Sequence, residues 1–312
     1  MTAASVDASR VGDAGRGGPR ARPARLPVAE RAVVAVMLLP ALAVLVPFFL
    51  LPMAVLVRNS VWIQQAPGLL VPALSLDTYL MVLTDFFYLE MFANTFGVSL
   101  AVTVLTALIG YPFAYFIVRR SGRWRAVLIW CLYLPLLVSV IARVFGWIVI
   151  TADSGLINAT LLGLGLVEEP VRILYAPGGM LLGMTHRYLP IMVLPIAAAI
   201  VKSDPALIRA SRDLGSGPVA TFFRVELPLS LPGIIAGAQL VFAAVLSDFV
   251  LPLLLGSTRF RMLAPAIYDE AVGRMNWGHA AAIACLGVAI MAVVLMTSNT
   301  VVRRLAPWAR AL

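Results

Sequence analysis

The sequence predicts an all-α protein, a polytopic transmembrane bundle of six spans with both termini in the cytoplasm. Hydrophobic residues make up 61% of the 312 positions and charged residues 12%, and the mean hydropathy is +0.95. These values lie far outside the range of soluble domains. Six apolar segments each reach the roughly 20 residues that a helix needs to cross a bilayer. We expect these spans at residues 33–57, 96–118, 126–150, 180–201, 233–255 and 280–302.

The connections between these segments alternate in charge, which predicts the orientation. The N-terminal tail, residues 119–125, residues 202–224 and the C-terminus hold most of the 24 Lys and Arg residues, while acidic residues gather in the other connections. Because basic connections stay inside, both termini and an insert at residues 203–228 are expected in the cytoplasm. The net charge of +9 therefore reflects orientation in the lipid bilayer, and we expect no nucleic-acid partner.

The two ends of the chain differ in composition. Residues 1–30 are rich in Ala, Gly, Pro and Arg, which is typical of a disordered basic tail. The apolar run that follows is too long for a signal peptide and lacks an obvious cleavage site, so we expect an uncleaved first span. Residues 31–312 then form one transmembrane domain.

Two of the outer connections contain short helical patterns. Residues 74–83, LSLDTYLMVL, predict a helix at the membrane interface with Asp77 as its N-cap. Residues 153–166, DSGLINATLLGLGL, are too short to span and predict a re-entrant or surface helix.

The insert at residues 203–228 reads as two short amphipathic helices. Asp204 and Pro205 suit the start of the first helix, and Gly215 suits its end. The first helix presents a small apolar face, and the second has a stripe that Pro228 is expected to stop. The two faces are Leu207, Ala210, Ser211 and Leu214 in the first helix, and Val219, Phe222 and Phe223 in the second. An apolar hairpin in water suggests a docking partner.

The chain lacks the patterns of most enzyme chemistry. It has no P-loop, so we expect no nucleotide hydrolysis. It has no nucleophile set and no metal-ligand spacing of Cys or His, so we expect neither a metal site nor a cofactor. Cys131 and Cys285 fall near opposite membrane faces in the predicted topology, which argues against a disulfide.

Charged side chains inside spans are costly and usually functional. Arg143, Arg187 and Asp248 lie inside predicted spans, and His186 adjoins the second of them. A rise of about 1.5 Å per residue places all three charges in one layer of the membrane. Two readings stay open: a structural ion pair of Asp248 with Arg143 or Arg187, or a polar layer that faces a substrate.

The insert resembles the cytoplasmic loop of ATP-binding-cassette (ABC) importer permeases. That loop has Glu-Ala-Ala, three residues, Gly, nine residues and Ile-x-Leu-Pro; the same spacing is kept here by Arg209-Ala210-Ser211, Gly215 and Val225-Glu226-Leu227-Pro228. Arg209 replaces the usual Glu, Ser211 an Ala and Val225 an Ile. Nearly the whole chain after the tail is similar to the spermidine/putrescine-type branch, and to the first of its two paired permeases, as in residues 226–252, ELPLSLPGIIAGAQLVFAAVLSDFVLP.

The resemblance implies the type I ABC importer permease fold in the bacterial inner membrane and a set of partners. These are a second, related permease, cytoplasmic ABC ATPase subunits that hydrolyse ATP and receive the insert in a groove, and an extracytoplasmic solute-binding protein that delivers a small-molecule substrate. The residues expected to dock on the ATPase are Leu207, Arg209, Ala210, Ser211, Asp213, Leu214, Gly215, Val225, Leu227 and Pro228.

The substrate and the class of transporter have alternatives. Asp248 would suit a cation such as a polyamine, whereas Arg143 and Arg187 would suit a carboxylate or phosphonate. The same branch also carries ferric iron, opines, phosphonates and thiamine, and polyamine is the first expectation because of the resemblance. A stand-alone ion-coupled transporter would leave the 203–228 insert unexplained, and a membrane-embedded enzyme would lack a nucleophile or a metal.

Overall fold

The computed structural model describes residues 28–257 and 260–305, and the chain divides into two compact units at Ala54. The predicted tail therefore lies almost entirely outside the described residues. The described part of the first unit belongs to α1, Val28–Val61, which contains Pro40, Pro47 and Pro52. Its large apolar side chains are exposed along the described helix, as expected of a helix that faces lipid.

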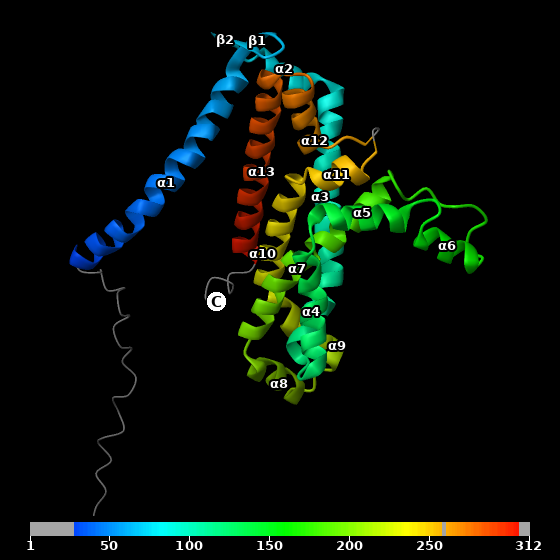
Figure 1. The fold of residues 1–312 in the computed structure, drawn as a ribbon. Helices are drawn as coiled ribbons and strands as arrows, with labels where there is room; N and C mark the ends of the chain where they lie inside the picture. The colour runs from blue at the N-terminus through cyan, green and yellow to red at the C-terminus, as the bar shows by residue number, and fades with distance from the viewer. Residues whose placement is uncertain (1–27, 258–259, 306–312) are drawn as a thin grey trace, which may run out of the picture. The chain divides into compact units, whose positions relative to one another are not determined.

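The second unit is a helical bundle centred on three long helices. α3 (Phe86–Arg119), α7 (Pro177–Lys202) and α10 (Leu227–Leu246) pack against one another, and α13 (Trp277–Leu305) runs beside them (Figure 1). Glycine permits the close approach of α10 to α7, because a Cβ atom at Gly233 would clash with the Pro195 carbonyl oxygen. The central helices thereby enclose an apolar core.

Shorter elements cover both ends of this bundle (Figure 1). At one end, two strands form an antiparallel hairpin, an addition to the predicted all-α fold. Gln64 in this hairpin donates to the Met275 carbonyl oxygen and accepts from the Gly278 N–H, so the hairpin is tied to the start of α13. The shorter elements are β1 (Trp62–Ala66), β2 (Leu69–Leu74), α2 (Asp77–Thr84), α4 (Arg123–Leu137), α5 (Val140–Thr151), α6 (Leu156–Gly163), α8 (Pro205–Asp213), α9 (Pro218–Thr221), the π-helix η2 (Phe222–Glu226), α11 (Val250–Leu255), α12 (Leu263–Tyr268) and the π-helix η3 (Asp269–Gly273).

The prediction of six spans is confirmed, because six described helical stretches are long and apolar enough to cross a membrane. The third and fifth stretches differ clearly from their predicted positions. The second span starts earlier than predicted, at Phe86, where Asp85 accepts a hydrogen bond from the Phe87 N–H. The six stretches are Val36–Val61, Phe86–Arg119, Val140–Gly163, Pro177–Lys202, Pro218–Leu246 and Trp277–Thr300.

The third predicted span, 126–150, is wrong as a single helix. α4 ends at Leu137 and α5 begins at Val140, with Val138 extended and Ser139 outside the helical conformation. Figure 1 shows α5 turning away from the direction of α4. Hydropathy reports apolar side chains, not backbone angles, so this break was invisible in the sequence pattern. The predicted short helix in 153–166 is present as α6.

The fifth predicted span, 233–255, is also displaced. Pro228 does not stop the second helix of the insert: α9, η2 and α10 follow one another without interruption to Leu246. Pro228 falls in the first turn of α10, directly after the π-helical turn, where its missing N–H is tolerated. The chain then breaks at Ser247–Phe249 before α11.

The predicted cap of α2 is wrong by one position. Leu76 occupies the N-cap of α2, and Asp77 is its first residue. The Asp77 carboxylate instead accepts a hydrogen bond of 2.7 Å from the Ser75 hydroxyl. Asp77 still lies in the first turn, where a negative charge suits the helix dipole.

Candidate transport and coupling sites

Asp248 lies in the break between α10 and α11 and is nearly inaccessible, with 6% of its surface exposed. One carboxylate oxygen accepts the backbone N–H groups of Val250 and Leu251, at 3.0 and 3.4 Å. These are unpaired donors at the start of α11, so Asp248 acts as a helix cap. The break between α10 and α11 therefore places Asp248 where its side chain can cap α11.

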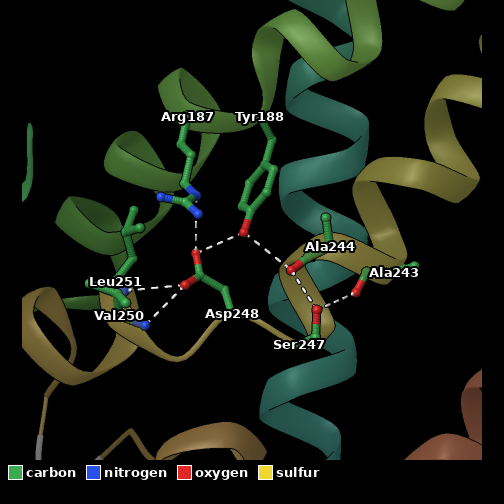
Figure 2. Close-up of polar contacts among 8 residues, drawn as sticks. All are labelled: Arg187, Tyr188, Ala243, Ala244, Ser247, Asp248, Val250 and Leu251. Atoms are coloured by element: carbon green, nitrogen blue, oxygen red, sulfur yellow. Dashed lines mark hydrogen bonds and ion pairs between the residues drawn. The ribbon is translucent and has the colours of Figure 1, made fainter. Parts of the chain in front are cut away.

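The second carboxylate oxygen of Asp248 faces α7 (Figure 2). It accepts a hydrogen bond of 2.8 Å from the Tyr188 hydroxyl and lies 3.7 Å from Arg187 Nε. Tyr188 also lies 3.2 Å from the Ala244 carbonyl oxygen. Arg187 and Arg143 were both possible partners of Asp248 from the sequence, and the structure selects Arg187. Tyr188 was missed, although it continues the polar run Thr185-His186-Arg187.

Arg143 lies beside this pair without joining it. Arg143, His186 and Arg187 line one small cavity together with Trp147. Trp147 Nε1 donates to His186 Nδ1 at 3.4 Å. We call Arg143, His186, Arg187 and Asp248 the charged layer. The structure thus brings together all four residues that sequence analysis placed at similar depth.

The predicted depth of Arg143 was nevertheless based on a wrong assumption, namely one continuous helix from residue 126. The helix breaks after Leu137 and a new one begins at Val140. Arg143 reaches the layer because α5 packs against α7 and α11.

The hairpin of α8 and α9 caps the opposite end of the bundle (Figure 1). The Asp204 side chain accepts the Ala206 N–H at 2.8 Å, as predicted for its N-cap role. Gly215 follows the helix with φ +84°, a left-handed conformation that favours glycine. Ile208 and Thr221 are buried between the two arms of the hairpin, and the Ser211 and Thr221 hydroxyls lie 3.3 Å apart.

The predicted docking residues fall into two groups. The docking residues in α8 and in the turn that follows it are exposed, except for the half-buried Ser211. Leu214 is 87% exposed. Val225, Leu227 and Pro228 are half-buried at the base of the hairpin, where it joins α10. Exposed Val219 and Phe223 extend the apolar surface of the hairpin. The exposed group is Leu207, Arg209, Ala210, Asp213, Leu214 and Gly215.

An ion pair that sequence analysis did not identify joins the hairpin to α3. Arg119 Nη2 lies 3.1 Å from Glu226 Oε1, and Glu226 is 8% exposed. Glu226 occupies the variable position x of the Val-x-Leu-Pro motif, so the motif did not single out this residue as functional. Nearby, the Ser230 hydroxyl donates to the Tyr111 hydroxyl at 3.2 Å. The end of α3 and the base of the hairpin are thus linked by polar contacts.

No group of three or more His, Cys, Asp or Glu side chains in the described residues could hold a metal ion. A pocket of about 330 Å³ lies at the other end of the bundle, near α11, α12 and η3, with Phe87, Tyr88 and Glu270 among its lining residues. Its charged groups already interact, because Arg274 pairs with both Asp269 and Glu270.

The sequence of this helical bundle matches a family model. Residues 107–311 match the binding-protein-dependent transport system inner membrane component family. The chain belongs to this family. It is therefore a multi-pass inner membrane protein and a permease subunit of a binding-protein-dependent ABC importer, a transport subunit rather than an enzyme.

Individual relatives agree with this assignment. The chain is 29% identical over 252 residues to the spermidine/putrescine transport system permease protein PotB of Escherichia coli (strain K12), covering 81% of this chain and 91% of that protein. It is 32% identical to PotB of Haemophilus influenzae, covering 67% and 73%. It is 25% identical to a putative 2-aminoethylphosphonate transport system permease protein PhnU of Salmonella typhimurium, covering 81% and 87%.

Solved structures share the fold of this permease. A crystal structure of a bacterial alginate ABC transporter, in complex with an alginate pentasaccharide-bound periplasmic protein, aligns with TM-score 0.72 at 19% identity. The alignment covers 89% of this chain and 96% of that chain.

Proposed function

We propose that this permease and a second, related permease form the path of an ATP-driven importer for polyamines such as spermidine and putrescine. A separate cytoplasmic ATPase subunit binds the α8–α9 hairpin and supplies the force. An extracytoplasmic binding protein delivers the solute. The exposed apolar hairpin carries the mechanical part of this proposal, and the named relatives support the substrate.

The hairpin has the properties of a docking surface. Leu207, Leu214, Val219 and Phe223 are all exposed on a segment that charge bias places in the cytoplasm. Exposed apolar patches of this kind mark interaction sites. Arg209 and Asp213 flank the apolar residues on the exposed face, so charge as well as shape distinguishes one ATPase from another.

The hairpin is also built to pass on movement. α9, η2 and α10 are continuous, so a displacement of the hairpin reaches α10 without an intervening loop. The Arg119–Glu226 pair links the same segment to the end of α3. At the far end of α10 lies Asp248, and we propose that the charged layer borders the path of the solute there.

The substrate proposal rests on relatives. Spermidine/putrescine permeases are similar over most of their length and of this chain, and we extend their substrate class to this importer. Within the charged layer, Asp248 would attract an ammonium group, which would have to replace the Arg187 guanidinium beside Asp248 and over the Tyr188 ring. Ferric iron, opines, phosphonates and thiamine stay as alternatives, and competition by each of them tests this choice.

Uptake by the assembled importer in proteoliposomes tests the docking proposal. Leu214→Asp places a charge in the exposed apolar surface and should lower ATP-dependent uptake of labelled spermidine at least tenfold. The introduced carboxylate would become buried against the ATPase without a partner of opposite charge. Leu74→Asp is the matched control, since Leu74 is 84% exposed in β2 at the other end of the bundle. Normal uptake and ATPase binding by Leu214→Asp would refute docking at this hairpin.

A further inference from the structure

Asp248 is the one carboxylate that the two arginines of the charged layer share. A carboxylate offers about four acceptor positions. Three accept hydrogen bonds, from the Val250 and Leu251 N–H groups and the Tyr188 hydroxyl, and Arg187 Nε lies 3.7 Å away as an ion-pair partner. The charged layer therefore holds two guanidinium groups for one carboxylate, which pairs with Arg187.

The guanidinium groups keep donors that nothing accepts. Nε and Nη1 of Arg143 and Nη1 of Arg187 are shielded from solvent and have no hydrogen-bond partner within the described residues. Unpaired buried donors on charged groups are costly, and more so at membrane depth. An acceptor outside the described chain would remove this cost.

Four donor-bearing side chains border the cavity beside these groups, together with apolar ones. The four are Arg143, Trp147, His186 and Arg187. His186 Nδ1 already accepts from Trp147, which leaves the proton of the neutral ring on Nε2. The bordering polar groups therefore need an acceptor, and the surplus positive charge favours an anion.

The size of the cavity limits the ligand. The space available to the centre of a water-sized sphere is about 10 Å³, close to what one water molecule needs. We propose that this cavity binds a small monovalent anion, a halide ion or the tip of a carboxylate group, between Arg143 and Arg187. The inference rests on the proposed function only in placing the cavity beside the solute path.

Thermal melting of the complete importer in nanodiscs tests this inference. Midpoints are compared in potassium chloride, bromide, formate and isethionate at one ionic strength, because isethionate is too large for the cavity. Chloride should raise the midpoint by roughly 2–4 °C over isethionate. Arg143→Gln should abolish this difference, and Arg143→Lys, which keeps the charge, should retain part of it.

Arg172→Gln is the matched control, since Arg172 is exposed and does not line the cavity; it should behave as the wild type. A response to formate but not to chloride would assign the site to a carboxylate group. Equal midpoints in all four anions for the wild-type importer would overturn the inference, even if Arg143→Gln fails to assemble. Because melting does not measure transport, failure of polyamine uptake would leave this result intact.

Discussion

Asp248 connects two helices through one side chain. It lies two residues after the end of α10, caps α11 and binds Arg187 and Tyr188 of α7. A residue with so many structural contacts cannot contact a solute without giving some of them up. In the proposed cycle, a solute ammonium group would therefore compete with Arg187 for the same carboxylate.

Asp248→Ala should lower the stability of the bundle by roughly 2–4 kcal/mol, because it removes a cap and leaves Arg187 without its carboxylate. The measurement is the melting midpoint of the purified permease complex. Ser247→Ala is the control, since the exposed Ser247 hydroxyl bonds only to carbonyl oxygens of its own helix. A midpoint of Asp248→Ala equal to that of Ser247→Ala would show that the cap and pair contribute little.

Glu226 makes the corresponding contact at the hairpin end. Arg119→Gln removes the charge that pairs with the buried Glu226 carboxylate, whereas Arg119 itself is 38% exposed. We expect a loss of about 1–3 kcal/mol, and a smaller loss when Glu226→Gln is added, because no buried charge is then left unpaired. A double-mutant cycle on melting free energies measures this coupling. Strictly additive losses would show that the ion pair is not coupled.

At the scale of elements, the end of α8 depends on one backbone conformation. Gly215 has φ +84°, and a Cβ atom there would meet nothing within 4 Å. Gly215→Ala should therefore act through backbone strain alone, at about 1–2 kcal/mol, and misplace the hairpin. The expected result is more ATP hydrolysed for each solute imported.

Gly217→Ala provides the control for this change. Gly217 lies two residues further on, has equally open surroundings and has φ −63°, which any residue adopts. The ratio of ATP hydrolysed to solute imported should stay near the wild-type value in this variant. The same ratio for both variants would mean that the left-handed turn does not position the hairpin.

The helix boundaries show what sequence patterns can and cannot predict. The N-cap Asp204 and the turn at Gly215 were predicted because both depend on local backbone chemistry. The break after Leu137 and the passage of the helix through Pro228 were not, because a π-helical turn and tertiary packing decide them. The co-location of Arg143, Arg187 and Asp248 was predicted from depth, whereas Tyr188 and the choice of partner required the structure.

At the scale of the whole molecule, the proposed function assigns the solute path to the helical bundle and the transmission of force to the α8–α9 hairpin. α9, η2 and α10 form one uninterrupted helical stretch that leads from the hairpin to the charged layer. Transport should therefore depend on a separate ATPase that grips the hairpin and on a second permease that completes the path.

Uptake of labelled spermidine into proteoliposomes tests this dependence most directly. One preparation contains the full importer with its binding protein, a second lacks the ATPase, and a third contains this permease alone. We predict accumulation in the first preparation only, and only with ATP on the hairpin side of the membrane. Accumulation by this permease alone, without any ATPase, would contradict the account.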